Sequence, residues 1–413
     1  MSFLSERKEM PLIQKIGIGF IVGIVLGFVI GPYSDKPFIA VYLLPFLHIV
    51  GQIFLSLLKM LIVPLVFSSI VTGAASIGDP KALGRIGVKT VGLYLGTTVV
   101  AIIIGLVLGN VIVPGAGLTI TGVTGEAKAG ATVTEVILGI FPANPLKALV
   151  DANMLQVIVF ALFLGVAGAL LGKLGKPFLE VTESLAEIMY KVTGMVMRVA
   201  PYGVLALIAT TAARYGLAVL APFAKVIFTI YLGCFLHAVL VYSGLIVGVV
   251  HRSPLWFFRG VREAMVAAFV TRSSSGVLPI SMKNTQDNLG VSEQISSFVL
   301  PLGATVNMDG TAIYQGVCAL FIAQAFGIPL SIGAQVGILI TATLASIGTA
   351  GVPGAGLIML SMVVTSAGLP IEGLGLVAGI DAVLDMARTC INVTGDMCVA
   401  AVVATTEGEK LKS

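Results

Sequence analysis

A stripe of polar side chains runs through an otherwise apolar stretch near the C-terminus, between residues 381 and 396. Its members are Asp381, Asp385, Arg388, Thr389, Asn392 and Asp396. At about 100° per residue these positions fall on one face of a single α-helix, roughly 100° wide. Apolar residues such as Leu384 and Ile391 occupy the other faces. Such a helix needs a polar surrounding on one side and an apolar surrounding on the others.

Composition indicates what surrounds that helix. The chain has 413 residues, of which 57% are hydrophobic and 11% charged, whereas ordinary soluble domains are about one quarter charged. Several apolar runs approach or exceed the roughly 20 residues that cross a bilayer, so the chain is predicted to be an integral membrane protein. Because a charge at the bilayer centre costs at least about 2.5–3.5 kcal/mol, the polar stripe must face a protein-lined cavity. It marks a functional site.

Other classes of function find no support in the sequence. The four cysteines (Cys234, Cys318, Cys390 and Cys398) lie singly in apolar segments without a CxxC pair. They are predicted to be small core residues, not disulfide or metal ligands. No GxxxxGK[ST] loop is present, which argues against transport driven by ATP on this chain. The net charge of +4 is assigned to basic cytoplasmic loops, with no nucleic-acid partner.

Basic residues predict the orientation in the membrane. They cluster on alternate connections between apolar runs: Arg7 and Lys8, then Lys81, Arg85 and Lys89, then Lys173 and Lys176, then Arg252, Arg259 and Arg262. The intervening connections are poorer in Lys and Arg. By the positive-inside rule these connections lie in the cytoplasm. We expect a multi-pass protein of the cytoplasmic membrane with both termini in the cytoplasm.

Two apolar runs in the C-terminal part are interrupted by polar or glycine-rich tips. The first, around residues 264–279, is broken by Thr271–Gly276, and the second, around 333–367, by Ser346–Gly356. Each half of the first run holds about a dozen residues or fewer, too short to span a bilayer. A re-entrant helical hairpin explains this pattern, because non-helical backbone at membrane depth must be enclosed by protein. The charged flanks predict that the two hairpins enter from opposite sides.

A similar polar segment follows each hairpin. Asn307–Thr311 reads NMDGT and Asn392–Asp396 reads NVTGD, and we expect a break in the helix at both places. The two hairpin tips also resemble one another, as SSGVLP and TAGVP. Hairpin and broken helix in the same order, with opposed entry, indicate an inverted repeat. This architecture is typical of secondary transporters that bind their substrate near the bilayer midplane.

Four motifs carry a resemblance to a known family. They are Thr271–Pro279 (TRSSSGVLP), Pro301–Thr311 (PLGATVNMDGT), Ser346–Gly356 (SIGTAGVPGAG) and Asp385–Asp396 (DMARTCINVTGD). In this order they closely resemble the sodium-coupled acidic amino acid transporters, the dicarboxylate/amino acid:cation symporter or glutamate transporter family. The resemblance extends over nearly the whole chain.

The resemblance implies an all-α membrane fold with eight transmembrane helices, two re-entrant helical hairpins and inverted repeats. Residues 1–85 would hold scaffold helices one and two, 86–113 helix three of a transport domain, and 114–215 an exposed loop with scaffold helices four and five. Residues 216–413 would complete the transport domain with helix six, hairpin one, helix seven, hairpin two and helix eight. The family implies a homotrimer that works by an elevator movement of the transport domain.

The resemblance also implies residues that contact an acidic amino acid. Arg388 resembles the clamp for the substrate side-chain carboxylate, to which a guanidinium offers two parallel hydrogen bonds. Asp385 resembles the partner of the substrate ammonium. Helix N-termini at the hairpin tips would favour the α-carboxylate. The other implied contacts are Arg272, Ser273, Ser274, Ser275, Met308, Thr311, Val352, Pro353, Gly354, Ala355, Gly356, Thr389 and Asn392.

Three sites for sodium ions are implied in the same way, built from the hard oxygen ligands that such cations prefer. The first resembles a site of backbone oxygens of Gly303, Asn307 and Asn392 with the carboxylate of Asp396. The second resembles one made by carbonyls of Thr305, Ser346, Ile347 and Thr349 near Met308. The third resembles one formed by Asp309, Asn307, Tyr94, Thr97 and Thr98.

A charge count favours coupling to cations. Asp309, Asp381, Asp385 and Asp396 contribute −4 and Arg272 with Arg388 contributes +2, which leaves −2. An acidic amino acid would make this −3. Burying such a charge is very costly unless cations enter as well. About three sodium ions would balance it, and protonation of a carboxylate could replace one of them.

Two alternatives belong to other functional classes, and a third shares the fold but uses a different coupling ion. An intramembrane hydrolase would need Asp381 and Asp385 as a dyad that shares a proton, yet both lie on one helix beside Arg388. The serines at 273–275 have no histidine nearby in the sequence. A pure ion channel would not need an arginine and an aspartate arranged for a zwitterion. A proton-coupled symporter of the same fold, for glutamate or a C4-dicarboxylate, remains open.

Overall fold

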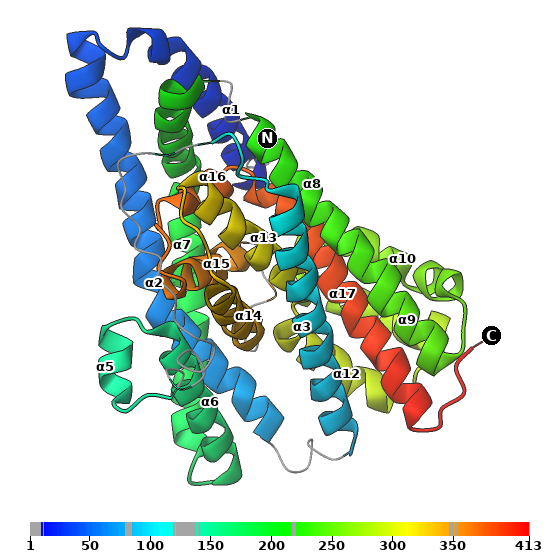
Figure 1. The fold of residues 1–413 in the computed structure, drawn as a ribbon. Helices are drawn as coiled ribbons and strands as arrows, with labels where there is room; N and C mark the ends of the chain where they lie inside the picture. Colours follow the sequence, from blue (N-terminus) through cyan, green and yellow to red (C-terminus); the bar gives the residue numbers. More distant parts are fainter. Residues whose placement is uncertain are drawn as a thin grey trace, which may run out of the picture.

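The computed structural model describes residues 10, 12–78, 85–118, 120, 138, 141–216, 220–346, 351 and 354–412 (Figure 1). Within these ranges the chain is helical and contains no β-strand, which confirms the all-α class. The elements before residue 216 are α1 (Leu12–Ile30), η1 (Gly31–Tyr33), η2 (Ile39–Leu43), α2 (Leu44–Gly78), α3 (Arg85–Ile112), α5 (Pro145–Val150), α6 (Met154–Leu170) and α7 (Lys176–Tyr215). The predicted exposed loop after residue 114 falls mostly outside the described residues.

The remaining elements belong to the C-terminal half. They are α8 (Leu220–His237), η4 (Ala238–Tyr242), α9 (Ser243–Leu245), η5 (Ile246–Val250), α10 (Pro254–Thr271), α11 (Ser274–Lys283), η6 (Asn284–Leu289), α12 (Glu293–Val306), α13 (Asp309–Ala325), α14 (Ile332–Ser346), α15 (Ala355–Ser366), α16 (Gly373–Ala378) and α17 (Asp381–Thr406). The elements α8, η4, α9 and η5 follow one another without a gap, so residues 220–250 form one long helical segment with two π-helical turns.

One set of helices packs through glycines. α7 contacts α1, α2 and α6, and α2 also contacts α6. Gly19, Gly23 and Gly27 of α1 lie against the backbone of α7. A Cβ on Gly23 would lie 2.8 Å from the carbonyl oxygen of Leu205, and one on Gly27 would lie 2.6 Å from that of Ala209. Small residues allow this close approach, as is common between membrane helices.

A second set surrounds α17, which is drawn in red in Figure 1. Helices α3, α8, α10, α12 and α13 all contact it. In α17, 83% of the candidate span is buried, against 22–39% in the other single candidate spans. All six members of the polar stripe between residues 381 and 396 are buried. The prediction that this stripe faces protein is confirmed.

Two helical hairpins meet at their tips. α10 folds back onto α11, and α14 onto α15. Arg272 ends α10 in a left-handed conformation (φ +55°), and Ser273 caps α11 by accepting from the N–H of Gly276 at 3.1 Å. The N–H of Ser275 donates to the carbonyl of Gly351 at 3.2 Å, and the hydroxyl of Ser273 donates to the same oxygen at 2.9 Å. These bonds join the two hairpins directly.

One of the two predicted helix breaks is wrong. Asn307 and Met308 are non-helical and separate α12 from α13, as predicted. The matching segment 392–396 instead lies within the unbroken helix α17. It contains no proline, and the hydroxyl of Thr394 donates to the carbonyl of Cys390 one turn earlier at 2.6 Å. Nothing in this segment therefore removes a backbone hydrogen bond from the helix.

The first arm of the first hairpin also differs from the prediction. α10 has 18 residues, more than the dozen expected. The helix extends outward to Ser253, whose side chain accepts from the N–H of Trp256 at 3.1 Å. Pro254 at the first helical position strengthens this start. The other arms are shorter, with 15 residues in α14 and 12 in α15.

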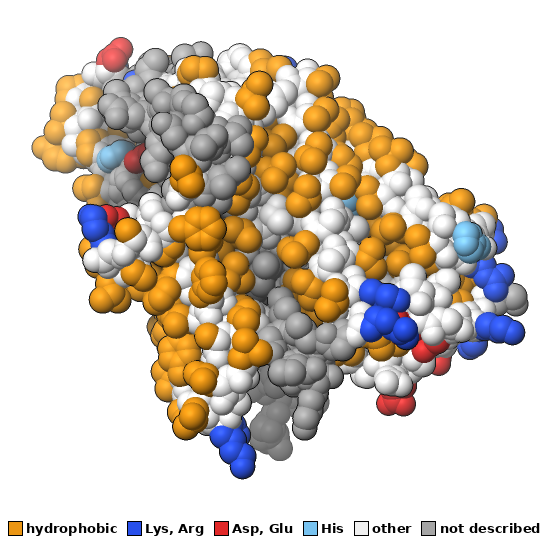
Figure 2. Space-filling model, turned by 60° about the horizontal axis from the view of Figure 1, so that its bottom comes forward, with side chains coloured by type: hydrophobic (Ala, Val, Ile, Leu, Met, Phe, Trp, Pro, Cys, Tyr) orange, Lys and Arg blue, Asp and Glu red, His pale blue; other side chains and the backbone are white. Residues whose placement is uncertain are grey.

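The described helices fit a membrane protein. Five are long and apolar enough to cross a bilayer, or six if the two halves of α7 form one span. Those halves meet at 49° near residue 197, four residues before Pro201, where a proline ring displaces the backbone. Apolar side chains are spread widely over the described part of the face in Figure 2, and Ile21, Val25 and Phe46 are more than half exposed. The eight-span count stays a prediction.

Candidate functional site

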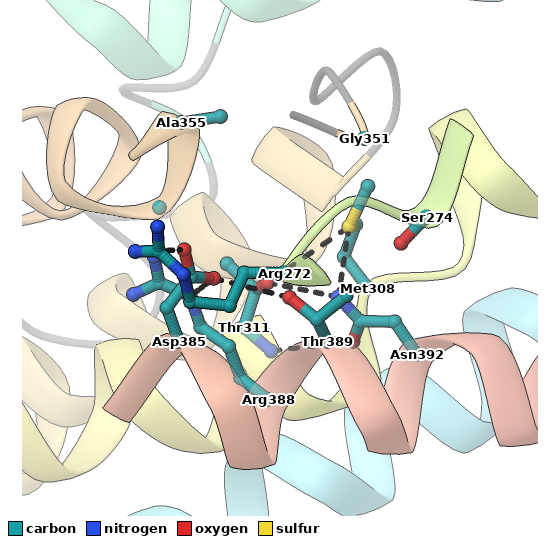
Figure 3. Close-up of a pocket in the computed structure, with 11 residues that line it drawn as sticks. Arg272, Ser274, Met308, Thr311, Gly351, Ala355, Asp385, Arg388, Thr389 and Asn392 are labelled. Atoms are coloured by element: carbon teal, nitrogen blue, oxygen red, sulfur yellow. Dashed lines mark hydrogen bonds and ion pairs between the residues drawn. The ribbon is translucent and has the colours of Figure 1, made fainter. Parts of the chain in front are cut away.

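A small cavity lies where the two hairpin tips approach α17 and the break between α12 and α13 (Figure 3). We call it the hairpin pocket. It is lined by Arg272, Ser274, Met308, Thr311, Gly351, Ala355, Gly356, Asp385, Arg388, Thr389 and Asn392. All but Gly351 belong to the residues expected to contact a substrate. Gly351 could have been predicted as well, because it lies within the second hairpin motif, Ser346–Gly356.

The hairpin pocket is small. The volume open to the centre of a water molecule is about 10 Å³, which is about what one water requires. The side chains that line the pocket bond to one another across it. A ligand larger than water therefore needs the hairpin tips to separate and some of these contacts to be exchanged.

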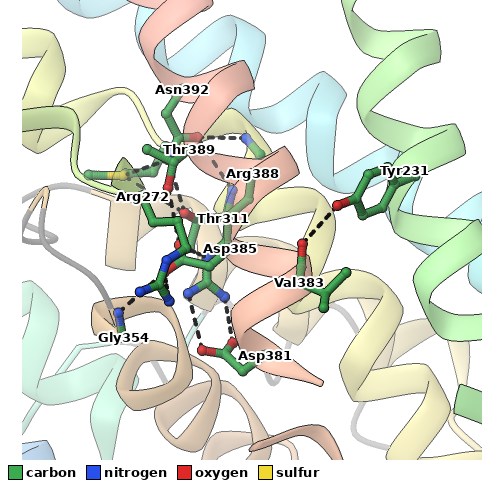
Figure 4. A network of polar contacts seen from close by, with 12 residues as sticks. Tyr231, Arg272, Thr311, Gly354, Asp381, Val383, Asp385, Arg388, Thr389 and Asn392 are labelled. Carbon is green, nitrogen blue, oxygen red and sulfur yellow. Dashed lines mark hydrogen bonds and ion pairs between the residues drawn. The ribbon is translucent and has the colours of Figure 1, made fainter. Parts of the chain in front are cut away.

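Arg388 is held between α13, α15 and α17. Its Nη1 donates to Oδ1 of Asp381 at 2.8 Å, and its Nε donates to Oδ1 of Asp385 at 2.8 Å (Figure 4). Its Cζ lies 4.5 Å from the centroid of the Tyr314 ring, within range of a cation–π interaction. A Cβ on Gly356 would lie 2.7 Å from Nη1, so this glycine leaves room for the guanidinium.

Two partners of Arg388 were missing from the expected contact residues. Asp381 belongs to the same polar stripe, seven residues before Arg388, and that spacing was a usable signal. Tyr314 lies on α13, far away in the sequence, and gave none. Both carboxylates and the guanidinium are buried. Paired charges of this kind satisfy one another in a low-dielectric surrounding.

Arg272 approaches Asp385 from the first hairpin. Its Nη1 lies 3.8 Å from Oδ2 of Asp385. Its Nε is buried and has no hydrogen-bond partner among the described residues. A buried donor left unpaired costs about 1–3 kcal/mol. The hairpin pocket thus retains hydrogen-bonding capacity suited to an anionic group.

Asn392 fastens the non-helical segment to α17. Its Oδ1 accepts from the N–H of Gly310 at 2.8 Å and of Thr311 at 3.4 Å. Its Nδ2 lies 3.2 Å from Oγ1 of Thr311 and 3.1 Å from the sulfur of Met308. The hydroxyl of Thr389 donates to Oδ1 of Asp385 at 3.1 Å. The polar atoms on this side of the pocket are thus fully engaged with one another.

The other expected contacts lie at the hairpin tips. The hydroxyl of Ser273 and the backbone N–H of Ser275 donate to the carbonyl of Gly351, and neither residue lines the pocket. The N–H of Gly354 lies 3.4 Å from Oδ2 of Asp385. Val352 and Pro353 lie outside the described residues.

A second polar group lies deeper, around Asp309, whose side chain is fully buried. We call it the Asp309 cluster. It consists of Tyr94, Thr97, Thr98, His237, Tyr242, Asn307, Asp309 and Asp396. Oδ1 of Asp309 accepts from the hydroxyls of Thr97 at 3.2 Å and Thr98 at 2.8 Å. Oδ2 lies 3.1 Å from Nε2 of His237 and 2.8 Å from the hydroxyl of Tyr242.

Asn307 connects Asp309 to Asp396. Its Nδ2 donates to Oδ1 of Asp396 at 2.9 Å, and its Oδ1 lies 3.5 Å from the hydroxyl of Thr97. Gly303 leaves room for this contact, because a Cβ there would lie 2.5 Å from the Tyr94 hydroxyl and would collide with the Asp396 carboxylate. The expected residues of the first and third sodium sites are thus neighbours in the structure.

The expected second sodium site is described only in part. The hydroxyl of Thr305 donates to the carbonyl of Leu302 at 3.0 Å, and that of Ser346 donates to the carbonyl of Thr343 at 2.7 Å. Both are ordinary bonds within a helix. Ile347 and Thr349 lie outside the described residues.

The charges of the Asp309 cluster are not balanced by basic residues. Within the described part of the chain no Lys or Arg forms an ion pair with Asp309 or Asp396. The neighbours of Asp309 and Asp396 offer hydroxyl, amide and carboxylate oxygens. Among the described residues, no group of three or more His, Cys, Asp or Glu is placed to hold a metal ion. Hard oxygen donors of this kind suit Na⁺, Mg²⁺ or Ca²⁺ better than zinc or copper.

The candidate catalytic residues that the structure describes do not form a catalytic arrangement. Asp381 and Asp385 both pair with Arg388 instead of with each other. Ser273 and Ser275 contact the other hairpin, and His237 contacts Asp309 far from these serines. A buried, charge-lined pocket between two helical hairpins in a multi-pass membrane protein is instead the arrangement of a transporter.

Comparisons with known proteins identify the family. The model of the Sodium:dicarboxylate symporter family matches residues 12–406, and the chain belongs to this family. It is similar to the proton/sodium-glutamate symport protein of Geobacillus stearothermophilus, with 35% identity over 96% of each chain.

Two further relatives differ in the substrate that their names give. The proton/glutamate-aspartate symporter of Escherichia coli is 37% identical over 96% of this chain and 93% of its own. The C4-dicarboxylate transport protein of Rhodospirillum rubrum is 34% identical over 96% of this chain and 89% of its own. The relatives are transporters, and this chain is a membrane transporter and not an enzyme.

Proposed function

We propose that the chain is a sodium-coupled symporter of acidic amino acids, aspartate or glutamate or both. The observation that carries this proposal is that Arg272, Asp385 and Arg388 line one small pocket, with Asp381 paired to Arg388 beside it. An acidic amino acid presents two carboxylates and one ammonium. The two guanidinium groups and the carboxylate of Asp385 offer a partner for each of them.

Binding would proceed by exchange of ion pairs. Arg388 now uses Nη1 on Asp381 and Nε on Asp385. A substrate side-chain carboxylate would replace Asp385 at the guanidinium, and the released Asp385 would accept the substrate ammonium. One internal pair is exchanged for two pairs with the substrate, so no buried charge is left alone. The unpaired Nε of Arg272 would be available to the second carboxylate.

Coupling would come from the Asp309 cluster. In the hairpin pocket the charges of Arg272 and Arg388 offset those of Asp381 and Asp385, so the surplus of −2 lies on Asp309 and Asp396. The substrate adds −1. About three sodium ions would restore neutrality, because a buried uncompensated charge is very costly. The oxygen donors around Asp309 and Asp396 are the candidate ligands.

The second candidate is a proton-coupled symporter for glutamate or a C4-dicarboxylate. Two protons on Asp309 and Asp396 would also remove the surplus charge of that cluster. The names of two relatives include proton coupling and C4-dicarboxylate transport, respectively. Asp385 favours the amino acid, because a carboxylate beside the substrate would repel a dicarboxylate that has no ammonium.

Movement and assembly follow the family expectation. We infer eight membrane helices, with the two hairpins re-entrant from opposite sides, in a homotrimer in the cytoplasmic membrane. The set around α17 would move past the set of α1, α2, α6 and α7 as an elevator. Arg85 and Lys89 pair with Glu407, and Arg252 bonds to the carbonyl of Leu411. These contacts support a cytoplasmic C-terminus beside the basic connections.

Uptake into proteoliposomes tests this function. Labelled aspartate, glutamate and succinate are offered under an inward sodium gradient at equal pH, and separately under an inward proton gradient without sodium. We expect accumulation of an amino acid with sodium alone, abolished when an ionophore dissipates the gradient. Accumulation driven by protons without sodium, or preference for succinate, would establish the second candidate instead.

A further inference from the structure

The carboxylate of Asp309 is held from two sides. Oδ1 faces Thr97 and Thr98 of α3, which belong to the proposed third cation site. Oδ2 faces His237 and Tyr242, which no part of the proposed function uses. Both of these side chains are fully buried. Their rings lie edge to face, with centroids 4.8 Å apart and planes at 86°.

A π-helical turn explains how residues five apart reach the same oxygen. In an α-helix, residues 237 and 242 would point about 140° apart at about 100° per residue. The turn Ala238–Tyr242 is π-helical, and its wider i→i+5 repeat brings both side chains onto nearly one face. The hydroxyl of Ser243 donates to the carbonyl of Ala238 at 3.1 Å, and these two residues are also five apart. Such turns are frequent at functional sites.

The opposite helix makes room for Tyr242. A Cβ on Gly395 would lie 2.5 Å from the Tyr242 hydroxyl. That hydroxyl also lies 3.1 Å from the carbonyl of Ile391. Gly395 lies in the segment 392–396, where the sequence predicted a break in α17. The helix is intact there, and the missing side chain of Gly395 leaves space for Tyr242 to reach Asp309.

We propose that His237 and Tyr242 are positioning residues for the cation site at Asp309. By holding Oδ2 they fix the carboxylate plane, so that Oδ1 faces the hydroxyls of Thr97 and Thr98. Nε2 of His237 faces Oδ2 of Asp309 at 3.1 Å, and Nδ1 of the same ring has no partner among the described residues. This inference rests on the proposed sodium coupling.

Loss of either donor should weaken the cation and leave the amino acid site intact. Without one of the two donors, Oδ2 keeps a single partner, and the plane of the carboxylate is held less firmly toward Thr97 and Thr98. Residues that orient a metal ligand typically change metal affinity by 10- to 100-fold when replaced. Neither His237 nor Tyr242 lines the hairpin pocket, and both contact Asp309 instead. Aspartate affinity at saturating sodium should therefore change little.

A matched pair of amides separates positioning from packing. In His237→Gln the amide reaches the place of Nε2, and in His237→Asn it falls short, although the polar group is the same. Tyr242→Phe keeps the ring and removes only the hydroxyl. Thr229→Val serves as the control, because Thr229 is buried on the same helix and donates to the carbonyl of Lys225.

The measurement is aspartate binding to the purified full chain across a sodium series. We expect His237→Asn and Tyr242→Phe to raise the half-saturating sodium concentration about tenfold. His237→Gln and Thr229→Val should stay close to the wild type. Equal sodium dependence in all four variants would overturn the positioning role, as would an equal loss in His237→Gln and His237→Asn. A wild type without any sodium dependence would overturn the proposed function itself, and the inference with it.

Discussion

The buried carboxylates of the hairpin pocket and of the Asp309 cluster are compensated by different kinds of partners. In the hairpin pocket, Asp381 and Asp385 share Arg388, and Arg272 approaches from the other hairpin. In the Asp309 cluster, two carboxylates are surrounded by hydroxyls, an amide and an imidazole. The first region is neutral by itself, and the second has a surplus of negative charge.

Under the proposed function, this difference places substrate binding in the hairpin pocket and cation binding in the Asp309 cluster. A neutral, self-paired pocket can exchange its internal ion pairs for a substrate. A region with a charge surplus remains costly until cations or protons arrive. Asn307, Met308 and Asn392 connect the two regions through the break between α12 and α13. Cation binding at one end can therefore stabilise the backbone that lines the other.

Removal of Arg388 should have the largest effect. Arg388→Ala leaves Asp381 and Asp385 without their shared partner and the substrate carboxylate without a clamp. The loss of a buried, hydrogen-bonded charge partner costs about 2–5 kcal/mol, so aspartate binding should disappear from the measurable range. Arg388→Lys keeps the charge but not the planar fork, and should recover only part of it. Unchanged aspartate affinity in the alanine variant would contradict the assignment.

Asp385→Asn should separate two kinds of ligand. If Asp385 accepts the substrate ammonium, the variant loses a charged hydrogen bond of about 1.5–3 kcal/mol for aspartate. Succinate, which has no ammonium, should bind as well as before or better. Competition binding of both ligands to the same purified preparation makes the comparison. An equal loss for both would remove this role from Asp385.

Two glycine substitutions should affect the two regions separately. Gly356→Ala places a Cβ against the guanidinium of Arg388, and Gly303→Ala places one against Tyr94 and Asp396. Overpacking costs about 1–3 kcal/mol. We expect Gly356→Ala to weaken aspartate at saturating sodium, and Gly303→Ala to weaken sodium. Gly96→Ala is the control, because no atom lies within 4 Å of its Cβ position. The same response from Gly356→Ala and Gly303→Ala would show that the regions are not separable.

Glu407→Gln should have the smallest effect and leave both regions unchanged. Hydrogen bonds from Lys89 and Arg85 lower the pKa of Glu407. A carboxyl with a lowered pKa stabilises the fold above its unfolded pKa of about 4.3, and this is lost as the pH falls through the folded value. Thermal unfolding should therefore show slight destabilisation of the variant at pH 7, which shrinks as the pH falls below about 4.3. A difference that does not shrink as the pH is lowered would exclude this cause.

The sequence predicted much of the hairpin pocket because its central element is periodic. Spacings of three, four and seven residues place Asp381, Asp385 and Arg388 on one helical face whatever surrounds that helix. The break at Asn307 was also predictable, whereas the similar segment at 392–396 was not broken. A short motif does not determine whether tertiary contacts open the helix.

The Asp309 cluster was harder to predict in full. The family resemblance predicted that Thr97, Thr98 and Asp309 belong to a cation site. A lone histidine in an apolar helix, in contrast, forms no pattern from which its contact with Asp309 could be predicted. His237 reaches Asp309 because a π-helical turn and the absence of a side chain at Gly395 coincide. Both features depend on packing between distant segments, and neither follows from local periodicity.

The central claim is that surplus negative charge at Asp309 and Asp396 couples cations to the substrate. Calorimetry of aspartate binding to the purified chain tests it across a sodium series, with choline keeping the ionic strength constant. Because cation and substrate offset one another's charge, their coupling is positive and reciprocal. We predict a steep rise of aspartate affinity with sodium, with a log–log slope above one that flattens in Asp309→Asn and Asp396→Asn. Aspartate affinity that ignores sodium and follows pH would contradict sodium coupling.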